Sequence, residues 1–357
     1  KEIFIVILIF ILSIISYFFI EQPARNKRYN FKSIFYLIIF FYFLLIIFNF
    51  NVISKKGHKQ RFSNLLIEAT KIISPRDMLR NSNNEKCYLK IDGCKFNTHS
   101  NKKVYLIGDS HMGSIMFNLK NRILDRNYQF ISFTIGSCIY FPGFYLDGTK
   151  IKEELKNCND YYFNNIKRIL AKEKNSIIIF GGRFPLYLNN YFFDNQEGGV
   201  EGKKWTVKYI SRGKYDSIET SFRNEVLNLS QKNKIILIYP IPEAGWEVPR
   251  KFLNLTKKLP YDLNNQDIKI SDFITTSYEV YKNRTKSSFE FLDSITGSNV
   301  FRVYPDRLFC NSLIKNRCLT HDSENLFYVD DDHPSLKGSQ MINDLIIDEI
   351  KKIESKN

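Results

Sequence analysis

The chain has 357 residues, 44% of them hydrophobic, and a formal net charge of +15 at pH 7, so it can build a large core. The positive charge suits nucleic acid or an anionic surface, but the sequence has no arginine-rich helix, zinc-finger spacing or stacked aromatic motif. We therefore expect no nucleic-acid partner. We attribute the charge mainly to a compositional bias, which would also favour contact with an anionic envelope or polymer.

Two apolar segments near the N-terminus are each long enough to cross a membrane. Residues 3–20 and 33–50 carry no charge, and about 18 apolar residues match a hydrocarbon core of roughly 30 Å. We expect two transmembrane helices within residues 1–50. A cleaved signal peptide is the alternative for the first segment, but its apolar core is too long and a second span follows. Because the chain starts with lysine, we expect the C-terminal part of a longer protein, or a fragment.

Two features of the sequence indicate the orientation of these spans: the charge of the flanking loops and the pattern of cysteines. The loop between them is basic, which favours a cytoplasmic loop and places the rest of the chain outside, although the far end of the second span is similarly basic. The cysteines fall into three close pairs without CxxC spacing: Cys87 with Cys94, Cys138 with Cys158, and Cys310 with Cys318. These pairs favour disulfides and an oxidising compartment. Six unrelated buried thiols are the alternative.

The rest of the chain divides into a linker and one domain. Residues 51–101 are polar and rich in asparagine, and we expect a juxtamembrane linker. From 102 to 357, short apolar runs alternate with helical patterns, which predicts a three-layer α/β/α domain with a parallel sheet. Strands are expected at residues 104–107, 130–135, 177–180, 235–239 and 326–329. Helices are expected after Ser110 and near 152–172, 217–232 and 337–353, while 254–296 has no pattern that we can assign.

Ser110 lies where the first predicted strand turns into a helix, in "KVYLIGDSHMG". In an open α/β sheet, ligands bind at the carboxyl ends of the strands. Free N–H groups at the start of a helix also favour developing negative charge. Ser110 is therefore a candidate nucleophile whose own N–H would contribute to an oxyanion hole. A serine that only caps the helix is the alternative.

A serine nucleophile needs a base, and His333 is the best placed of the five histidines. It follows the last predicted strand, with Asp330 three residues earlier, so one turn can present both side chains to the same side. His111, next to Ser110, suits packing or hydrogen bonding better than proton transfer. The alternative is a surface loop whose acidic run and Ser335 cap the final helix. Because Gly-Asp-Ser occurs in the same chain, we favour a triad of Ser110, His333 and Asp330.

These two blocks, in this order, resemble the SGNH (GDSL-like) hydrolase superfamily, with Ser110 in the first block and Asp330 and His333 in the last. "SYFFIEQPARNK" is similar to the end of the membrane acyltransferase-3 domain. "YPIPEAGWEVPR", together with Cys310 and Cys318, resembles the SGNH domain that some of these acyltransferases carry at their C-terminus.

The resemblance implies O-acylation, usually O-acetylation, of an envelope glycan such as an O-antigen or a capsule. It also implies a bacterial inner membrane protein with its SGNH domain on the periplasmic side. The expected partners are the glycan acceptor, the membrane and the rest of the acyltransferase-3 domain, which would use acetyl-CoA as acyl donor. For the SGNH domain itself we expect no bound cofactor and no metal. The rival functions are an esterase with the same triad and a domain that only positions glycan.

The resemblance also assigns residues of the other blocks. Gly136 in "FTIGSC" matches the second-block glycine, whose N–H would be a second oxyanion donor. Where the superfamily has Gly-x-Asn-Asp, this chain has "IIIFGGRFPLYL", and Arg183 matches an arginine of the fused domains. Arg183 and His111 are thus candidates for substrate binding, with a salt bridge to a loop as the alternative for Arg183.

Overall fold

The computed structural model describes residues 2–25, 30–55, 57, 69–70, 73–147, 157–201, 208–256 and 273–356. The chain forms two compact units, Lys1–Arg61 and Phe62–Asn357. The expected linker falls partly outside the described residues, at 56, 58–68 and 71–72, as does the beginning of the helix expected near 152–172.

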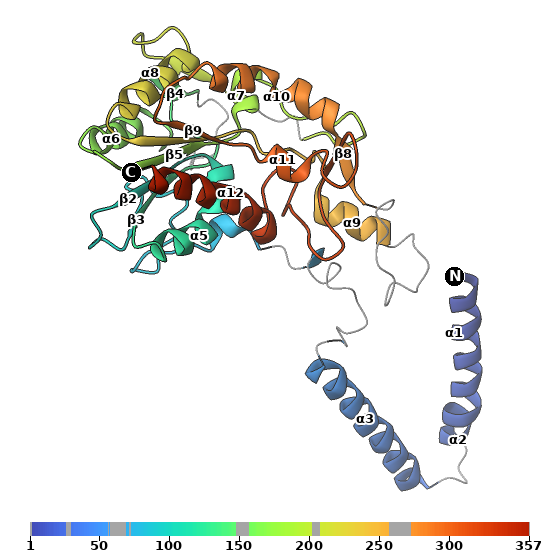
Figure 1. Cartoon of the computed structure of the whole chain (residues 1–357). Helices are drawn as coiled ribbons and strands as arrows, with labels where there is room; N and C mark the ends of the chain where they lie inside the picture. Colours follow the sequence, from blue (N-terminus) through green and yellow to red (C-terminus); the bar gives the residue numbers. More distant parts are fainter. Residues whose placement is uncertain are drawn as a thin grey trace. The chain divides into compact units, whose positions relative to one another are not determined.

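The first unit is helical. α1 (Glu2–Ser16) continues through a π-helical turn (Tyr17–Glu21) into α2 (Gln22–Arg25), and α3 (Phe31–Ser54) follows (Figure 1). By length and composition, the part of α3 from Lys32 to Ser54 is able to cross a membrane, while the apolar helix Ile5–Ser16 is shorter. Among the described residues, one of the two expected spans therefore has full length, because the first apolar α-helix gives way to π geometry after Ser16.

The second unit is built on a six-stranded sheet in the order β1-β3-β2-β5-β7-β9. Strands β2, β3, β5, β7 and β9 pair in parallel, and β1 pairs antiparallel with β3. Their central members are runs of β-branched and aromatic residues buried on both faces, as parallel sheets require. The bounds are β1 (Cys94–Phe96), β2 (Lys103–Gly108), β3 (Gln129–Thr134), β5 (Ile177–Gly181), β7 (Lys234–Ile238) and β9 (Val300–Val303). Two short hairpin-like sheets pair β4 (Phe144–Leu146) with β6 (Tyr209–Ser211) and β8 (Thr275–Ser277) with β10 (Arg317–Leu319).

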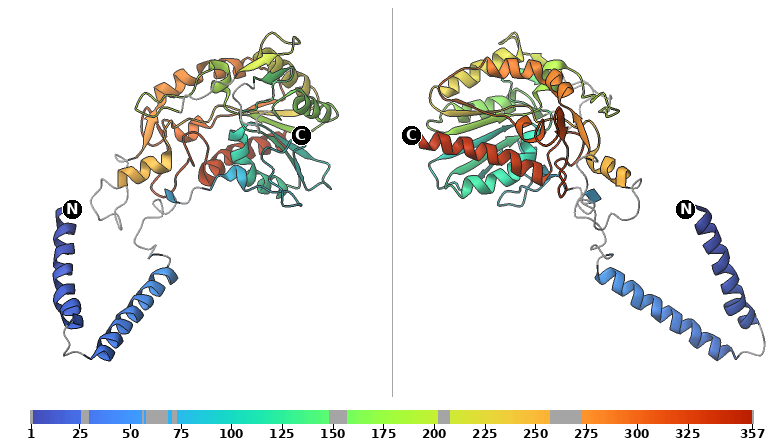
Figure 2. Two further views of the ribbon diagram at one scale, coloured as in Figure 1. Left: turned by 180° about the vertical axis from the view of Figure 1, so that it is seen from behind. Right: turned by 45° about the vertical axis from the view of Figure 1, so that its right-hand side comes forward.

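Helices cover both faces of this sheet. α5 (Ser110–Leu124) and α12 (Leu336–Ser355) lie on one side (Figures 1 and 2), where their apolar residues share a core with Val104, Leu106 and Ile236. α6 (Asp160–Leu170), α8 (Ile218–Ser230) and α10 (Tyr278–Asp293) lie on the other, against Tyr105, Ile107 and Ile235. Alternate residues of a strand thus feed separate cores, and the expected three-layer α/β/α architecture is confirmed. The remaining helices are short: a 3-10 helix (Pro75–Asp77), α7 (Phe184–Asn189), α9 (Val248–Thr256) and α11 (Asp306–Phe309).

Two expectations about the elements need correction. Residues 326–329 are not a strand: the place beside β7 belongs to Val300–Val303. The backbone of 326–329 instead turns back on itself, with Phe327 N–H donating to Thr320 and Val329 N–H to His333. The linker expected at 51–101 is also too long, because β1 and the 3-10 helix Pro75–Asp77 pack on the domain.

The six cysteines form three disulfides in the expected pairing: Cys87–Cys94, Cys138–Cys158 and Cys310–Cys318. The first fastens the segment before β1 to the edge of the sheet, and the third holds residues that precede the His333 loop. Each disulfide restricts the unfolded chain and thereby favours the folded one.

Candidate active site

Asp109 fixes the turn that presents Ser110. β2 ends at Gly108, and Asp109 caps α5 by accepting the N–H of His111 at 2.9 Å. Its other oxygen accepts the backbone N–H of Arg183 at 2.8 Å and the hydroxyl of Tyr187 at 3.0 Å. This fully buried carboxylate therefore ties the turn after β2 to the turn after β5. The sequence analysis missed it, although an aspartate directly before a helix is a capping signal.

Ser110, His333 and Asp330 form one chain of hydrogen bonds. His333 Nε2 lies 2.8 Å from Ser110 Oγ, and His333 Nδ1 lies 2.8 Å from Asp330 Oδ2. The other oxygen of Asp330 accepts the backbone N–H of His333 at 2.7 Å, which fixes the turn between them. Ser335 caps α12 as well, so the loop supports the final helix and presents the histidine. The structure brings together the three residues predicted as a triad.

Asp332 is a second carboxylate against His333. Its Oδ1 lies 2.6 Å from His333 Nδ1, and its Oδ2 lies 2.8 Å from Arg183 Nη1 and 3.2 Å from His111 Nε2. Burial alone would raise the pKa of Asp332, but Arg183 and His333 hold it well below its usual range. Burial also works against a charged His333, yet Asp332 and Asp330 outweigh it and raise the pKa of His333 to about 10.

Arg183 and His111 belong to this buried network. Arg183 also pairs with Glu243 at 2.6 Å and with Glu201 at 2.9 Å, so the structure shows the alternative, a salt bridge to a loop. His111 is only 1% exposed and bonds to Asp332. The expectation that His111 binds substrate is therefore corrected. Its burial leaves no face for a ligand, and its role is to hold Asp332 from within the protein.

Arg76 is a further residue at the triad that the sequence analysis missed. Its Nη1 lies 2.9 Å from His333 Nε2, and its guanidinium lies 5.6 Å from the ring centroid of Tyr88. It comes from the 3-10 helix Pro75–Asp77, within the segment expected to be a linker. The nearby pair Cys87 and Cys94 was the available sign that this segment is folded.

A pocket of about 140 Å³ opens beside Ser110. Gly136 is not part of its lining, whereas the next residue, Ser137, is. The expected role of Gly136 stays a prediction. The lining residues are Asp109, Ser110, Ser137, Arg183, Leu186, Tyr187, Glu201, Asp331, Asp332 and His333.

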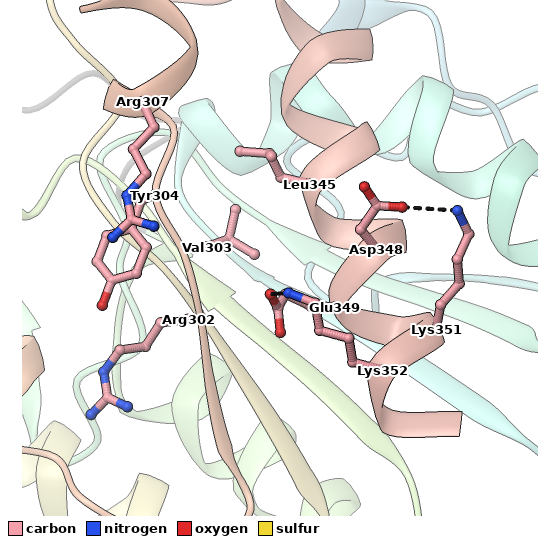
Figure 3. Close-up of a pocket in the computed structure, with 9 residues that line it drawn as sticks. All are labelled: Arg302, Val303, Tyr304, Arg307, Leu345, Asp348, Glu349, Lys351 and Lys352. Atoms are coloured by element: carbon pink, nitrogen blue, oxygen red, sulfur yellow. Dashed lines mark hydrogen bonds and ion pairs between the residues drawn. The ribbon is translucent and has the colours of Figure 1, made fainter. Parts of the chain in front are cut away.

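A larger pocket, of about 550 Å³, contains no triad residue. It lies between two parts of the chain (Figure 3). One is α12, and the other is the end of β9 with the residues that follow it, which supply Arg302, Tyr304 and Arg307. Two of its lysines pair with acidic neighbours on the same helix, Lys351 with Asp348 and Lys352 with Glu349. Much of the charge that lines it is thus already balanced.

Two sets of described side chains have donor atoms within 4.8 Å of one another, as a metal site would: His111, Asp332 and His333, and the run Asp330, Asp331 and Asp332. Arg183 already places a cation against Asp332, which both sets share, and Asp330 already engages Nδ1 of His333. Neither set is an open group of ligands. The expectation that the domain uses no metal stays a prediction.

Asp331 gives the domain a stability that depends on pH. Burial, with Asp332 and Asp330 nearby, raises the pKa of Asp331 to about 7, above about 3.9 for an unfolded carboxyl. Its folded form binds the proton more tightly, so stability falls as pH rises from about 4 to 7. We expect Asp331→Asn to raise the free energy of unfolding at pH 8 by on the order of 4 kcal/mol and to change little at pH 4. Urea unfolding at both pH values, with the exposed Asp216→Asn as control, measures this; equal effects at both values would contradict it.

Comparison with family models agrees with this fold. The family model of the SGNH domain fused to AT3 domains matches residues 77–348. No curated protein matches the chain. Among solved structures, the periplasmic domain of a lipopolysaccharide acetyltransferase from Salmonella ser. Paratyphi A is similar, with 17% identity and a TM-score of 0.43 over 70% of this chain and 84% of that one. The chain belongs to the family of SGNH domains that are fused to AT3 domains.

Proposed function

We propose that this protein is an O-acyltransferase, most simply an O-acetyltransferase, which modifies hydroxyl groups of a cell-envelope glycan through an acyl group on Ser110. The observation that carries the proposal is the chain of hydrogen bonds from Ser110 Oγ through His333 to Asp330, with distances of 2.8 Å at both steps. A serine at the first turn of a helix, a histidine and a carboxylate in this order are the parts of nucleophilic acyl transfer.

The reaction has two steps. In the first, Ser110 Oγ attacks the acyl carbon while its proton moves to His333 Nε2, and the histidine then gives this proton to the leaving group. In the second, a sugar hydroxyl attacks the acyl-serine and gives its proton to His333. The bond from Ser110 Oγ to the acyl carbon then breaks, His333 returns the proton to Oγ, and the sugar leaves as its ester. The N–H groups of Ser110 and Gly136 would stabilise the oxyanion in both steps. A pocket of about 140 Å³ beside Ser110 suits a small acyl group.

The family and the N-terminal unit support a membrane setting. A domain fused to AT3 domains would receive its acyl group from that membrane part, with acetyl-CoA as the original donor. The 23-residue stretch Lys32–Ser54 is long enough to anchor the chain. Three disulfides favour an oxidising compartment. We therefore place the domain on the periplasmic side of the inner membrane, with the glycan as acceptor.

The full chain in detergent, given an activated acetyl ester and an envelope oligosaccharide, tests this function. We expect acetyl on the sugar to exceed free acetate. Ser312→Ala should behave as the wild type, because Ser312 is exposed and its hydroxyl donates to the carbonyl of Phe309. Free acetate alone would make the protein an esterase. If neither acetylated sugar nor free acetate forms, the domain only positions glycan.

A further inference from the structure

Arg76 contacts the nitrogen of His333 that would take the serine proton. Its Nη1 lies 2.9 Å from Nε2, which also lies 2.8 Å from Ser110 Oγ. A guanidinium can only donate hydrogen bonds, and Nε2 accepts one only when it carries no proton. The contact therefore fits the neutral, base-competent form of His333.

The placement of Arg76 is built into the fold. Pro75, before it, is buried, and its 3-10 helix packs on α5. Its guanidinium lies over the ring of Tyr88, and this ring fits against Gly113 of α5, where an added Cβ would come within 2.8 Å of it. Tyr88 follows Cys87, which is bonded to Cys94 at the edge of the sheet. The segment that precedes the sheet thus brings a cation to the triad.

The other charged groups around His333 favour its protonated form. Asp330 and Asp332 contact Nδ1 from its own loop, and Glu247 and Asp331 add negative charge nearby. From α5, the His111 ring lies 5.3 Å away, and from the turn after β5, Arg183 acts through Asp332. The carboxylates raise the pKa of His333 to about 10. Among the described residues, Arg76 is the cation that contacts Nε2 directly and opposes this.

We propose that Arg76 is a further catalytic residue of the proposed acyl transfer, which opposes protonation of His333 Nε2 in the free site and turns to the oxyanion when Nε2 takes the proton of Ser110. The bond from Oγ to the acyl carbon forms, the carbonyl electron pair moves to oxygen, and the serine proton goes to Nε2, while Arg76 keeps all its protons. At that moment Nε2 ceases to accept, and a new anion forms on the oxygen of the carbon attached to Oγ.

Arg76 would thereby supply an oxyanion donor in a chain that lacks the asparagine of the superfamily's Gly-x-Asn-Asp. The residue at that place, Arg183, has its guanidinium tied to Glu201, Glu243 and Asp332. Arg76, by contrast, contacts the reacting atoms, since Nε2 is a direct partner of the nucleophile. This inference rests on the proposed function and names a group of the same site.

The test is the rate of Ser110 acetylation by an activated acetyl ester from pH 6 to 10, in the full chain. We expect Arg76→Gln to lower the rate at pH 7 by about 10²–10³-fold, as the loss of an oxyanion donor does, with partial recovery toward pH 10 as Nε2 loses its proton. Added guanidinium ion should restore part of the rate. Arg76→Lys keeps the charge and should retain more activity. Arg80→Gln is the matched control, because Arg80 is exposed and donates to the carbonyl of Asn84.

An Arg76→Gln protein with the wild-type rate and pH profile would overturn the inference. A faster variant would overturn it too, because it would show that Arg76 blocks His333 Nε2. An equal loss at every pH without guanidinium rescue would assign Arg76 a structural role and overturn it too. These results need a wild type that acetylates Ser110. A wild type without acetylation would refute the proposed function itself, and this inference with it.

Discussion

Cells that carry Ser110→Ala are expected to lose acylation of their envelope glycan by on the order of 10³-fold or more. The hydroxyl of Ser110 is the group that would carry the acyl moiety, and its partner His333 Nε2 lies 2.8 Å away. His333→Ala should cause a similar loss. The double variant should lose no more than either single one, because residues that act as a unit are not additive. Mass spectrometry of the isolated glycan measures the acyl content.

Ser312→Ala controls for expression and for loss of a hydroxyl, since Ser312 is exposed and its hydroxyl donates to the carbonyl of Phe309. Asp330→Asn should cost less than His333→Ala, because Asp332 also contacts Nδ1, at 2.6 Å, and can hold the imidazole. Unchanged glycan acylation in the Ser110→Ala strain would contradict the triad. Increased acylation would mean that the domain removes acyl groups.

Replacing Arg183 with methionine is expected to lower the free energy of unfolding by about 3–5 kcal/mol, the usual cost of breaking a buried ion pair. Its guanidinium bonds to Glu243, Glu201 and Asp332, and the side chain is 8% exposed. Glu243 would keep Arg284 at 3.0 Å, whereas Asp332 would lose its only guanidinium among the described contacts and keep His333 and His111. Urea unfolding of the full chain in detergent gives the free energy.

Two further variants make this prediction specific. Arg223→Met removes an exposed arginine that bonds to Ser294, and should change stability by less than about 0.5 kcal/mol. Asp332→Asn in the Arg183→Met background should recover part of the loss, since it removes a buried carboxylate that has lost its guanidinium partner. A loss below about 1 kcal/mol in Arg183→Met, without such recovery, would show that the network does not stabilise the domain.

The sequence predicts the part of the fold that is local. β2, the turn at Asp109 and α5 follow from an apolar run, a capping residue and a helical spacing that are contiguous in the chain. The meeting of Ser110 with His333 follows as well, because both were expected at the same edge of a parallel sheet. That inference succeeded although residues 326–329 are not a strand: the loop reaches the same edge through its own turns.

The rest depends on contacts between distant residues. α10 was unassigned because its buried face includes Arg284, Thr285 and Ser288, which weakens the apolar periodicity that marks a helix. β9 is only four residues long and has two half-buried residues, so Val300–Val303 gave a weaker signal than 326–329. The partners of Arg183 are distant along the chain: Glu201 lies 18 residues away, Glu243 60 and Asp332 149. No local pattern connects them.

The most direct test of the acyl-serine is a pulse and chase. The full chain is exposed briefly to an activated acetyl ester, freed of it, and given an envelope oligosaccharide, while mass spectrometry follows the Ser110 peptide and the sugar. We predict that Ser110 gains one acetyl group and loses it at the rate at which the sugar gains one. Acetylated sugar without acetyl on Ser110, or acetyl-Ser110 that the sugar never removes, would contradict the account.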